Sequence, residues 1–107
     1  QVFYLAPDGI EISEPVICSV DMADVLLEFS NTNIDVIRVD VITSDDAYQF
    51  SQNAYMSKLP IIFHSDDKSA LKLALLSYHG RAMIDKECDI DYNTLEKISY
   101  KYGAVIY

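Results

Sequence analysis

Apolar stretches alternate with helical patterns along most of the chain, and four segments share one order of residue types. In each, an apolar run ends in a small cluster of Ser and Asp, and a helical pattern follows: VICSVDMADVLLEF, VDVITSDDAYQF, PIIFHSDDKSALKLALL and AMIDKECDIDYNTLEKI. Ser and Asp side chains accept hydrogen bonds from the free N–H groups at a helix start, and their charge suits the positive end of the helix. The clusters are therefore predicted, first of all, to be helix N-caps.

Four helices follow from the spacing of the apolar residues. The first is predicted at 21–30, where one buried stripe contains Met22, Val25, Leu26 and Phe29. The second begins after Ser44. The third covers 68–79 with Gly80 as its C-terminal cap, and it is more apolar than one stripe requires, so part of it is expected to face a partner. The last helix follows Asp91.

Strands are predicted between these helices. Residues 34–42 are rich in β-branched side chains, as in a parallel strand buried on both faces, and Pro60 opens a strand at 61–64. A shorter strand is expected at 81–85, and residues 104–107 are expected to form either a final strand or a clipped connection. The start differs, because a strand at 2–5 is followed by Asp8-Gly9, which is typical of a hairpin turn.

This order of elements predicts an α/β fold. We expect a three-layer arrangement in which helices cover both faces of a mostly parallel five-stranded sheet, with an atypical N-terminal segment. The chain has 107 residues, half of them hydrophobic, so residues 1–107 are expected to form a single domain with one core. No apolar run approaches the roughly 20 residues of a membrane span, and no signal peptide is apparent, so we expect a soluble, cytoplasmic protein.

The net charge of −9 is unevenly spread. Residues 1–59 carry ten acidic residues against Arg38 and Lys58, whereas residues 60–107 are nearly balanced. A field of this sign repels nucleic acids and anionic membranes, so neither is expected as a direct partner. A solvated acidic surface and a binding face for a basic protein are both compatible with it.

Few residues offer chemistry by their spacing. Cys18 and Cys88 lack a CxxC pattern or nearby His ligands and are predicted to be buried thiols. His64 is expected to form hydrogen bonds at the end of its strand. Two acidic pairs, Asp45-Asp46 and Asp66-Asp67, are interpreted as helix caps, with a divalent cation among them as the alternative.

Three motifs together resemble a response-regulator receiver domain. The segment VICSVDMADVLLEFSNTNIDVIRVDV is similar to its second and third strands, PIIFHS to its fourth strand, and ALKLALLSYHGRAMIDKECDIDYNTLEKI to the elements that follow. The resemblance implies that Asp40 is the phosphoacceptor and that Ser65 and Lys86 contact the phosphoryl group. A carboxylate nucleophile, a hydroxyl donor and a neutralising lysine suit that chemistry, and in open α/β sheets they meet at the strands' carboxyl ends.

The chain departs from the family in several places. The acidic pair that would bind Mg²⁺ is reduced to Asp8, so the candidate metal ligands are Asp8 and Asp40, and no other cofactor is expected. The first helix is shortened or missing, and Met83 stands at the aromatic switch position. These losses are typical of a pseudo-receiver.

The resemblance implies a non-enzymatic module of a two-component phosphorelay that acts by protein–protein interaction, with or without phosphorylation. Expected partners are a histidine kinase, a fused domain or a second copy, bound through the last two helices and the strand between them. One alternative is a stand-alone acidic inhibitor or immunity-type protein for a basic partner. Another is a thioredoxin-like fold without its redox motif, which a cis peptide at Leu59-Pro60 would support.

Overall fold

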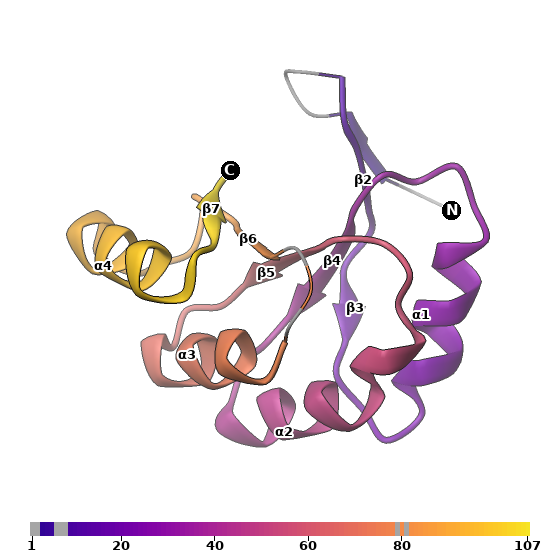
Figure 1. Ribbon diagram of the computed structural model, residues 1–107, viewed down its shortest axis with the longest axis horizontal. Coiled ribbons are helices and arrows are strands. Elements are labelled where there is room, and N and C mark those ends of the chain that lie inside the picture. Colours follow the sequence, from indigo (N-terminus) through magenta and orange to yellow (C-terminus); the bar gives the residue numbers. More distant parts are fainter. Residues whose placement is uncertain (1–2, 6–8, 79, 81) are drawn as a thin grey trace.

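The chain folds into a parallel β-sheet with four α-helices and a short hairpin (Figure 1). The computed structural model describes residues 3–5, 9–78, 80 and 82–107. Its elements, in chain order, are β1 (Phe3–Leu5), β2 (Glu11–Ser13), β3 (Val16–Ile17), α1 (Met22–Ser30), β4 (Ile37–Asp40), α2 (Ser44–Asn53), the 3-10 helix η1 (Ala54–Met56), β5 (Ile61–His64), α3 (Lys68–Ser77), β6 (Ala82–Ile84), α4 (Tyr92–Tyr102) and β7 (Val105–Ile106). The predicted α/β class and five-stranded parallel sheet are confirmed.

The N-terminal segment is the predicted hairpin. Strands β1 and β2 pair antiparallel, with Phe3 opposite Ser13. Gly9 lies in the connection with φ 89°, a left-handed conformation that glycine adopts at low cost, while Asp8 lies outside the described residues. Ile12 of β2 also forms an isolated parallel bridge to Val36, so the hairpin adjoins the main sheet.

The main sheet has the sequential strand order β3-β4-β5-β6-β7, and every neighbouring pair is parallel. A flavodoxin-like sheet, by contrast, has the order 2-1-3-4-5, in which the chain reverses its direction across the sheet. When the chain advances in one direction only, right-handed crossovers bring every connecting helix to the same face. A sheet with sequential order also lacks a switch point, which is the place where the strand order reverses.

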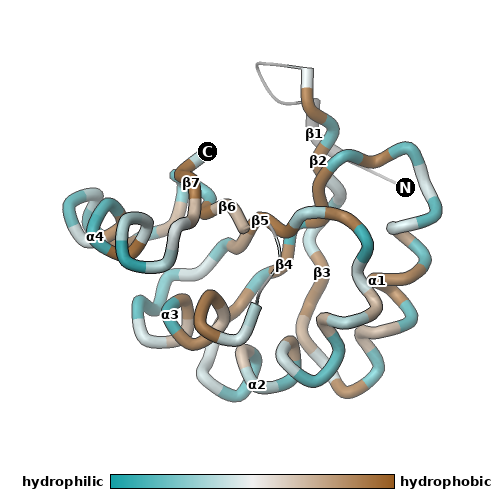
Figure 2. Tube along the Cα trace, viewed as in Figure 1, coloured by the Kyte–Doolittle hydropathy of each residue, from teal (hydrophilic) through white to brown (hydrophobic). Residues whose placement is uncertain are grey.

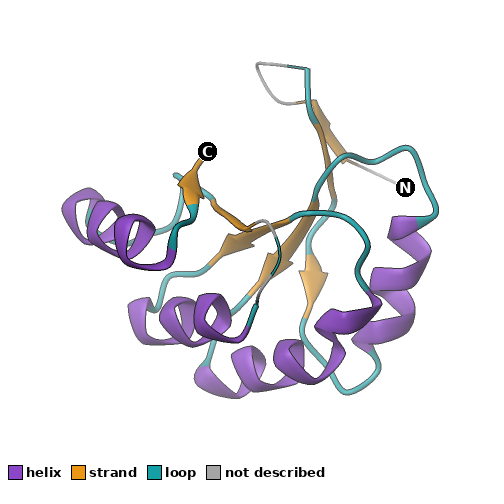
Figure 3. Cartoon of the chain, in the orientation of Figure 1, coloured by secondary structure: helices purple, strands orange, loops and turns teal. Residues whose placement is uncertain are grey.

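The helices gather on one face of this sheet. Buried residues from all four helices form one cluster with alternate strand residues, among them Ile37, Val39, Phe63 and Ile84. Figure 3 shows the helices together on one side of the strands, with the hairpin rising away from them. The sequence predicted helices on both faces, whereas the described helices cover one, because each crossover continues in the same direction across the sheet.

Aromatic rings fill the centre of this core. The rings of Phe50, Phe63 and Tyr78 contact one another edge to face, with centroids 5.1 to 6.0 Å apart. Phe50 and Phe63 are completely buried. In Figure 2 the central strands are mostly brown, and the helices alternate brown with teal, as expected for elements that bury one side.

The helix limits agree with the predictions to within a few residues. Gly103 ends α4 in the left-handed conformation, with φ 68°. The predicted cap at Gly80 is wrong, because α3 already ends at Ser77 and Tyr78 is its C-cap residue. Val25 does not belong to the buried stripe of α1 and is 40% exposed. None of the described helices is long and apolar enough to cross a membrane.

Candidate functional site

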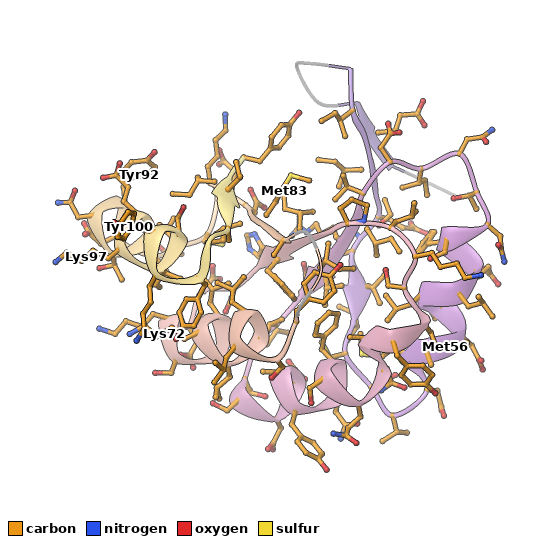
Figure 4. All side chains as sticks on the ribbon, viewed as in Figure 1. Met56, Lys72, Met83, Tyr92, Lys97 and Tyr100 are labelled. Carbon is orange, nitrogen blue, oxygen red and sulfur yellow. The ribbon has the colours of Figure 1, made fainter. Side chains whose placement is uncertain are left out.

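The register of the strands places two rows of side chains on the face of the sheet opposite the helices. Residues paired across parallel strands point to the same face. One row therefore contains Arg38, Ile62, Met83 and Val105, and the next contains Ile17, Asp40, His64 and Asp85. We call this the open face, because no described helix covers it. Figure 4 shows Met83 projecting from the sheet on the side away from the helices.

Four of these residues form a connected polar group, which we call the strand-end cluster: Arg38, Asp40, His64 and Asp85. Arg38 Nε donates to Asp40 Oδ1 at 2.8 Å, and Arg38 Nη1 lies 3.9 Å from Asp85 Oδ2. His64 Nδ1 lies 2.8 Å from the same Asp85 oxygen. Because an ionised carboxylate only accepts, Nδ1 carries the proton in this bond, which confirms the predicted hydrogen-bonding role of His64.

A cleft of about 430 Å³ opens beside this cluster. Its lining residues come from the ends of β4 and β5 and the loops that follow them: Arg38, Asp40, Val41, Ile42, His64, Ser65, Asp66 and Asp67. His64 Nε2 lies 3.7 Å from the exposed carboxylate of Asp66. The cleft therefore combines three carboxylates and an imidazole with one guanidinium, which is already engaged with Asp40. Such a set of acceptors suits a ligand that donates hydrogen bonds and carries positive charge.

The three residues of the predicted phosphoryl site are only partly brought together. Asp40 lies at the end of β4 and lines the cleft with Ser65, whereas Lys86 does not line it. Lys86 is exposed in the turn after β6 and makes no ion pair within the described part of the chain. The cation that contacts Asp40 is instead Arg38, from the same strand.

The hydroxyl of Ser65 is engaged in the loop that starts α3. Its Oγ accepts from the backbone N–H of Asp67 and donates to the Asp67 carbonyl, and the residue is buried. The N-cap of α3 is Asp67, whose carboxylate accepts from Ser69 N and Ala70 N. Ser65 therefore shapes the turn before the helix and does not cap the helix itself.

The acidic pairs act mainly as helix caps, as predicted. Asp46 accepts from the backbone N–H groups of Ile42 and Thr43 and completes a capping box with Thr43 at the start of α2. Asp91 caps α4. No group of three or more His, Cys, Asp or Glu side chains suited to a metal occurs among the residues described. The candidate ligand Asp8 lies outside them, and Asp40 is paired with Arg38.

Both cysteines are free and buried, which confirms that prediction. Burial, together with the nearby carboxylates of Asp46 and Asp40, raises the pKa of the Cys18 thiol from its ordinary value of 9.0 to about 12. Burial likewise raises the pKa of Cys88 to about 11, against a smaller lowering by the hydrogen bond from the Ser65 backbone. Thiols held in the protonated form are poor nucleophiles.

Arg38 and Asp85 were not identified as site residues from the sequence. The sequence does contain a signal for them. The strand segments IRVD, IIFH and AMID each have a polar residue at the strand end or directly after it, and in IRVD polar and apolar residues alternate. Interpreting 34–42 as a strand buried on both faces concealed this alternation. A charged residue at every second position indicates instead that one face is polar.

Two further observations bear on identity. The Leu59-Pro60 peptide is trans, since none of the described peptide bonds is cis, which weakens the thioredoxin-like alternative. Comparison of the chain with models of protein families, with curated proteins and with solved structures gives no significant match.

Proposed function

We propose that this chain is a receiver-like, pseudo-receiver module of a signalling pathway that acts by protein–protein contact and without phosphorylation. The observation that carries the proposal is the pairing of Asp40 with Arg38 at 2.8 Å. A receiver needs a free carboxylate beside a metal and a lysine. Here the carboxylate is already neutralised by a neighbour on its own strand, and Lys86 does not line its cleft. Sequential strand order also supports the absence of phosphorylation, because it provides no switch-point crevice for a phosphoryl site, and in this respect the sheet departs from the 2-1-3-4-5 order of receiver domains.

The contacting surface in this proposal consists of α3, β6 and α4. The outer side of α3 exposes Leu73 and Leu76, and α4 exposes Tyr92 and Tyr100, the latter 92% exposed. Figure 4 shows Tyr92, Tyr100 and Lys97 projecting outward from α4. Exposed tyrosines are favourable anchors in protein interfaces, since they bury a large area at a low cost in conformational entropy. The module would work in the cytoplasm, on a kinase, a fused domain or a second copy.

The proposal is tested with amide NMR spectra recorded with and without Mg²⁺ and beryllofluoride, which mimics a phosphoryl group on aspartate. We expect the resonances of Asp40, Ser65 and Lys86 to remain unchanged. Shifts centred on Asp40 that disappear in Asp40→Asn would show a working phosphoryl switch and contradict the proposal. Sedimentation of Tyr100→Ala beside the wild type then tests whether the partner is a second copy.

A second candidate function is supported by charge. The −9 net charge and the carboxylate-rich cleft also suit an acidic inhibitor that covers a basic surface of another protein. Affinity of such a pair falls steeply as salt rises, because the charges are screened. A partner affinity that is insensitive to salt would favour the signalling module.

A further inference from the structure

The open face is only partly covered. Behind its polar cluster lies a small apolar cluster of Ile12, Val36 and Ile62, which are themselves buried, and the partly buried Ile10, Met83 and Tyr107 pack against it. Along its margins Ile17, Ile42 and Val105 are each at least 60% exposed. Parallel sheets are normally covered by helices on both faces. An apolar strip therefore remains at the surface, formed by Met83 with Ile17, Ile42 and Val105, and it has the character of a surface that another helix covers.

The charges beside this strip identify the kind of helix. Asp40, Asp66 and Asp67 line the adjoining cleft and Asp85 completes the cluster, while Arg38 is the cation among them. Two copies of this face would place acidic clefts against each other, and each copy carries a net charge of −9. Electrostatic repulsion therefore disfavours a second copy as the occupant, and complementarity favours a basic one.

We propose that the open face binds an amphipathic α-helix of a partner protein, with apolar side chains over Met83 and Val105 and an Arg or Lys side chain in the cleft. The guanidinium or ammonium group would donate to the carboxylates of Asp66 and Asp67 and to His64 Nε2. This inference goes beyond the function proposed above, because it uses the opposite side of the molecule from α3 and α4.

The probe is a synthetic peptide of Leu, Ala and Arg whose leucines form one helical stripe, titrated into the ¹⁵N-labelled chain. A second peptide of the same composition has its leucines scattered. We expect the first peptide to shift the amide resonances of β5, β6 and the loop at Asp66, and to bind about tenfold more tightly than the second. That ratio corresponds to about 1.4 kcal/mol.

Two matched variants locate the binding site. Met83→Lys and Leu76→Lys each add one positive charge, the first on the open face and the second on the outer side of α3. We expect Met83→Lys to weaken binding about tenfold and Leu76→Lys to leave it within about twofold. Thermal unfolding of both variants establishes that they remain folded.

Several results would overturn the inference. Equal binding of the two peptides would mean attraction by charge alone, and equal effects of the two lysine variants would place the peptide elsewhere. Sedimentation showing a wild-type dimer that Met83→Lys dissociates would make a second copy the occupant. A phosphoryl response at Asp40 would contradict the proposed function and leave peptide binding at the open face unaffected.

Discussion

At the scale of single residues, Arg38 connects two carboxylates of the strand-end cluster. Its side chain is 19% exposed and holds Asp40 directly and Asp85 at longer range. Removing one partner from a largely buried charge group leaves the others without compensation, which costs more than the pair contributes in net terms. The stability of this end of the sheet therefore depends on the Arg38 guanidinium, which is the partner of Asp40, and on His64, which is the closer partner of Asp85.

We predict that Arg38→Ala lowers the free energy of unfolding by about 1–3 kcal/mol, because Asp40 loses its ion-pair partner and Asp85 keeps only its contacts with His64 and the backbone of Glu87. Asp40→Asn should cost less, since the amide oxygen still accepts from Arg38 Nε. Lys97→Ala, which removes one positive charge from the exposed side of α4, should change stability by less than about 0.5 kcal/mol. Urea unfolding at pH 7 measures all three, and an Arg38 variant no less stable than the Lys97 control would contradict the prediction.

The raised pKa of Cys18 predicts a loss of stability at alkaline pH. In the unfolded chain the thiol ionises near its ordinary value of 9.0, whereas burial in the folded protein delays ionisation to about pH 12. The stabilisation is therefore complete below pH 9 and is lost as pH rises toward 12, with a slope of at most about 1.4 kcal/mol per pH unit. Cys88 adds a smaller contribution of the same sign.

The measurement compares the wild type with Cys18→Ala by urea unfolding between pH 8 and pH 11. Both proteins contain the same tyrosines, so tyrosine ionisation cancels in the difference between them. We expect the stability advantage of the wild type to be constant near pH 8 and to shrink above pH 9. A difference that stays constant to pH 11 would show that the folded thiol ionises normally.

The pattern of single residues indicated part of the site. Asp40 and Ser65 do line one cleft, as expected from two successive strand ends. Lys86 does not, because it lies two residues beyond the end of β6, where the turn directs its side chain elsewhere. Arg38 was missed because its importance depends on which face of the strand is uncovered, and that is decided outside its own segment.

At the scale of elements, the start of α2 is the most fully capped. Thr43 Oγ1 accepts from Asp46 N, and the Asp46 carboxylate accepts from two backbone N–H groups in return. Asp45, the next residue in the same first turn, is exposed and makes no described side-chain hydrogen bond. Both aspartates lie where the helix dipole favours a negative charge, but only Asp46 caps the helix.

We predict that Asp46→Ala destabilises the protein by about 1 kcal/mol, while Asp45→Ala costs a few tenths of that amount. The reason is that only the first substitution leaves backbone donors without an acceptor. Thermal or urea unfolding of the two variants provides the comparison. Equal losses would mean that charge near the helix end, and not the capping box, stabilises α2.

Helix positions were predictable because their signals are local. Asp67 and Asp91 cap helices by bonds that reach two or three residues along the chain. The end of α3 was predicted less well, since Gly80 is a strong signal and Tyr78 is drawn into the core by the rings of Phe50 and Phe63. Tertiary packing outweighed the local preference there.

At the scale of the whole molecule, the sheet has a centre and two weak edges. Strands β4 and β5 pair over four positions, whereas β7 pairs with β6 over two. Val105 in β7 is also 61% exposed. Local opening is easiest where few buried contacts and few ladder bonds must break.

Hydrogen exchange followed by NMR should therefore be slowest for the amides of β4 and β5 and fastest, among the sheet amides, for those of β7. The physical reason is that β7 can open without disturbing the aromatic core, while β5 opens only with the global transition. Amides in β7 that exchange as slowly as those in β5 would show that the sheet unfolds as one unit.

Strand order could not be predicted from the sequence. The alternation of apolar runs and helical patterns predicts that each strand is followed by a helix. This holds equally for sheets with sequential strand order and for sheets in which the order reverses. What differs is on which side the next strand docks, which depends on long-range packing of the strand residues such as Ile61 and Ile84. The residues of the open face could therefore be identified only once the strand order was known.

Sequential strand order also makes the architecture extensible. Each strand and its helix meet mainly the unit before and the unit after, much as neighbouring repeats do in a solenoid. A unit of this kind could be gained or lost beside β7 during evolution without changing how the other strands pair. Such growth would lengthen the helix layer and the uncovered face in step, so the span of a docked helix could vary with the number of units.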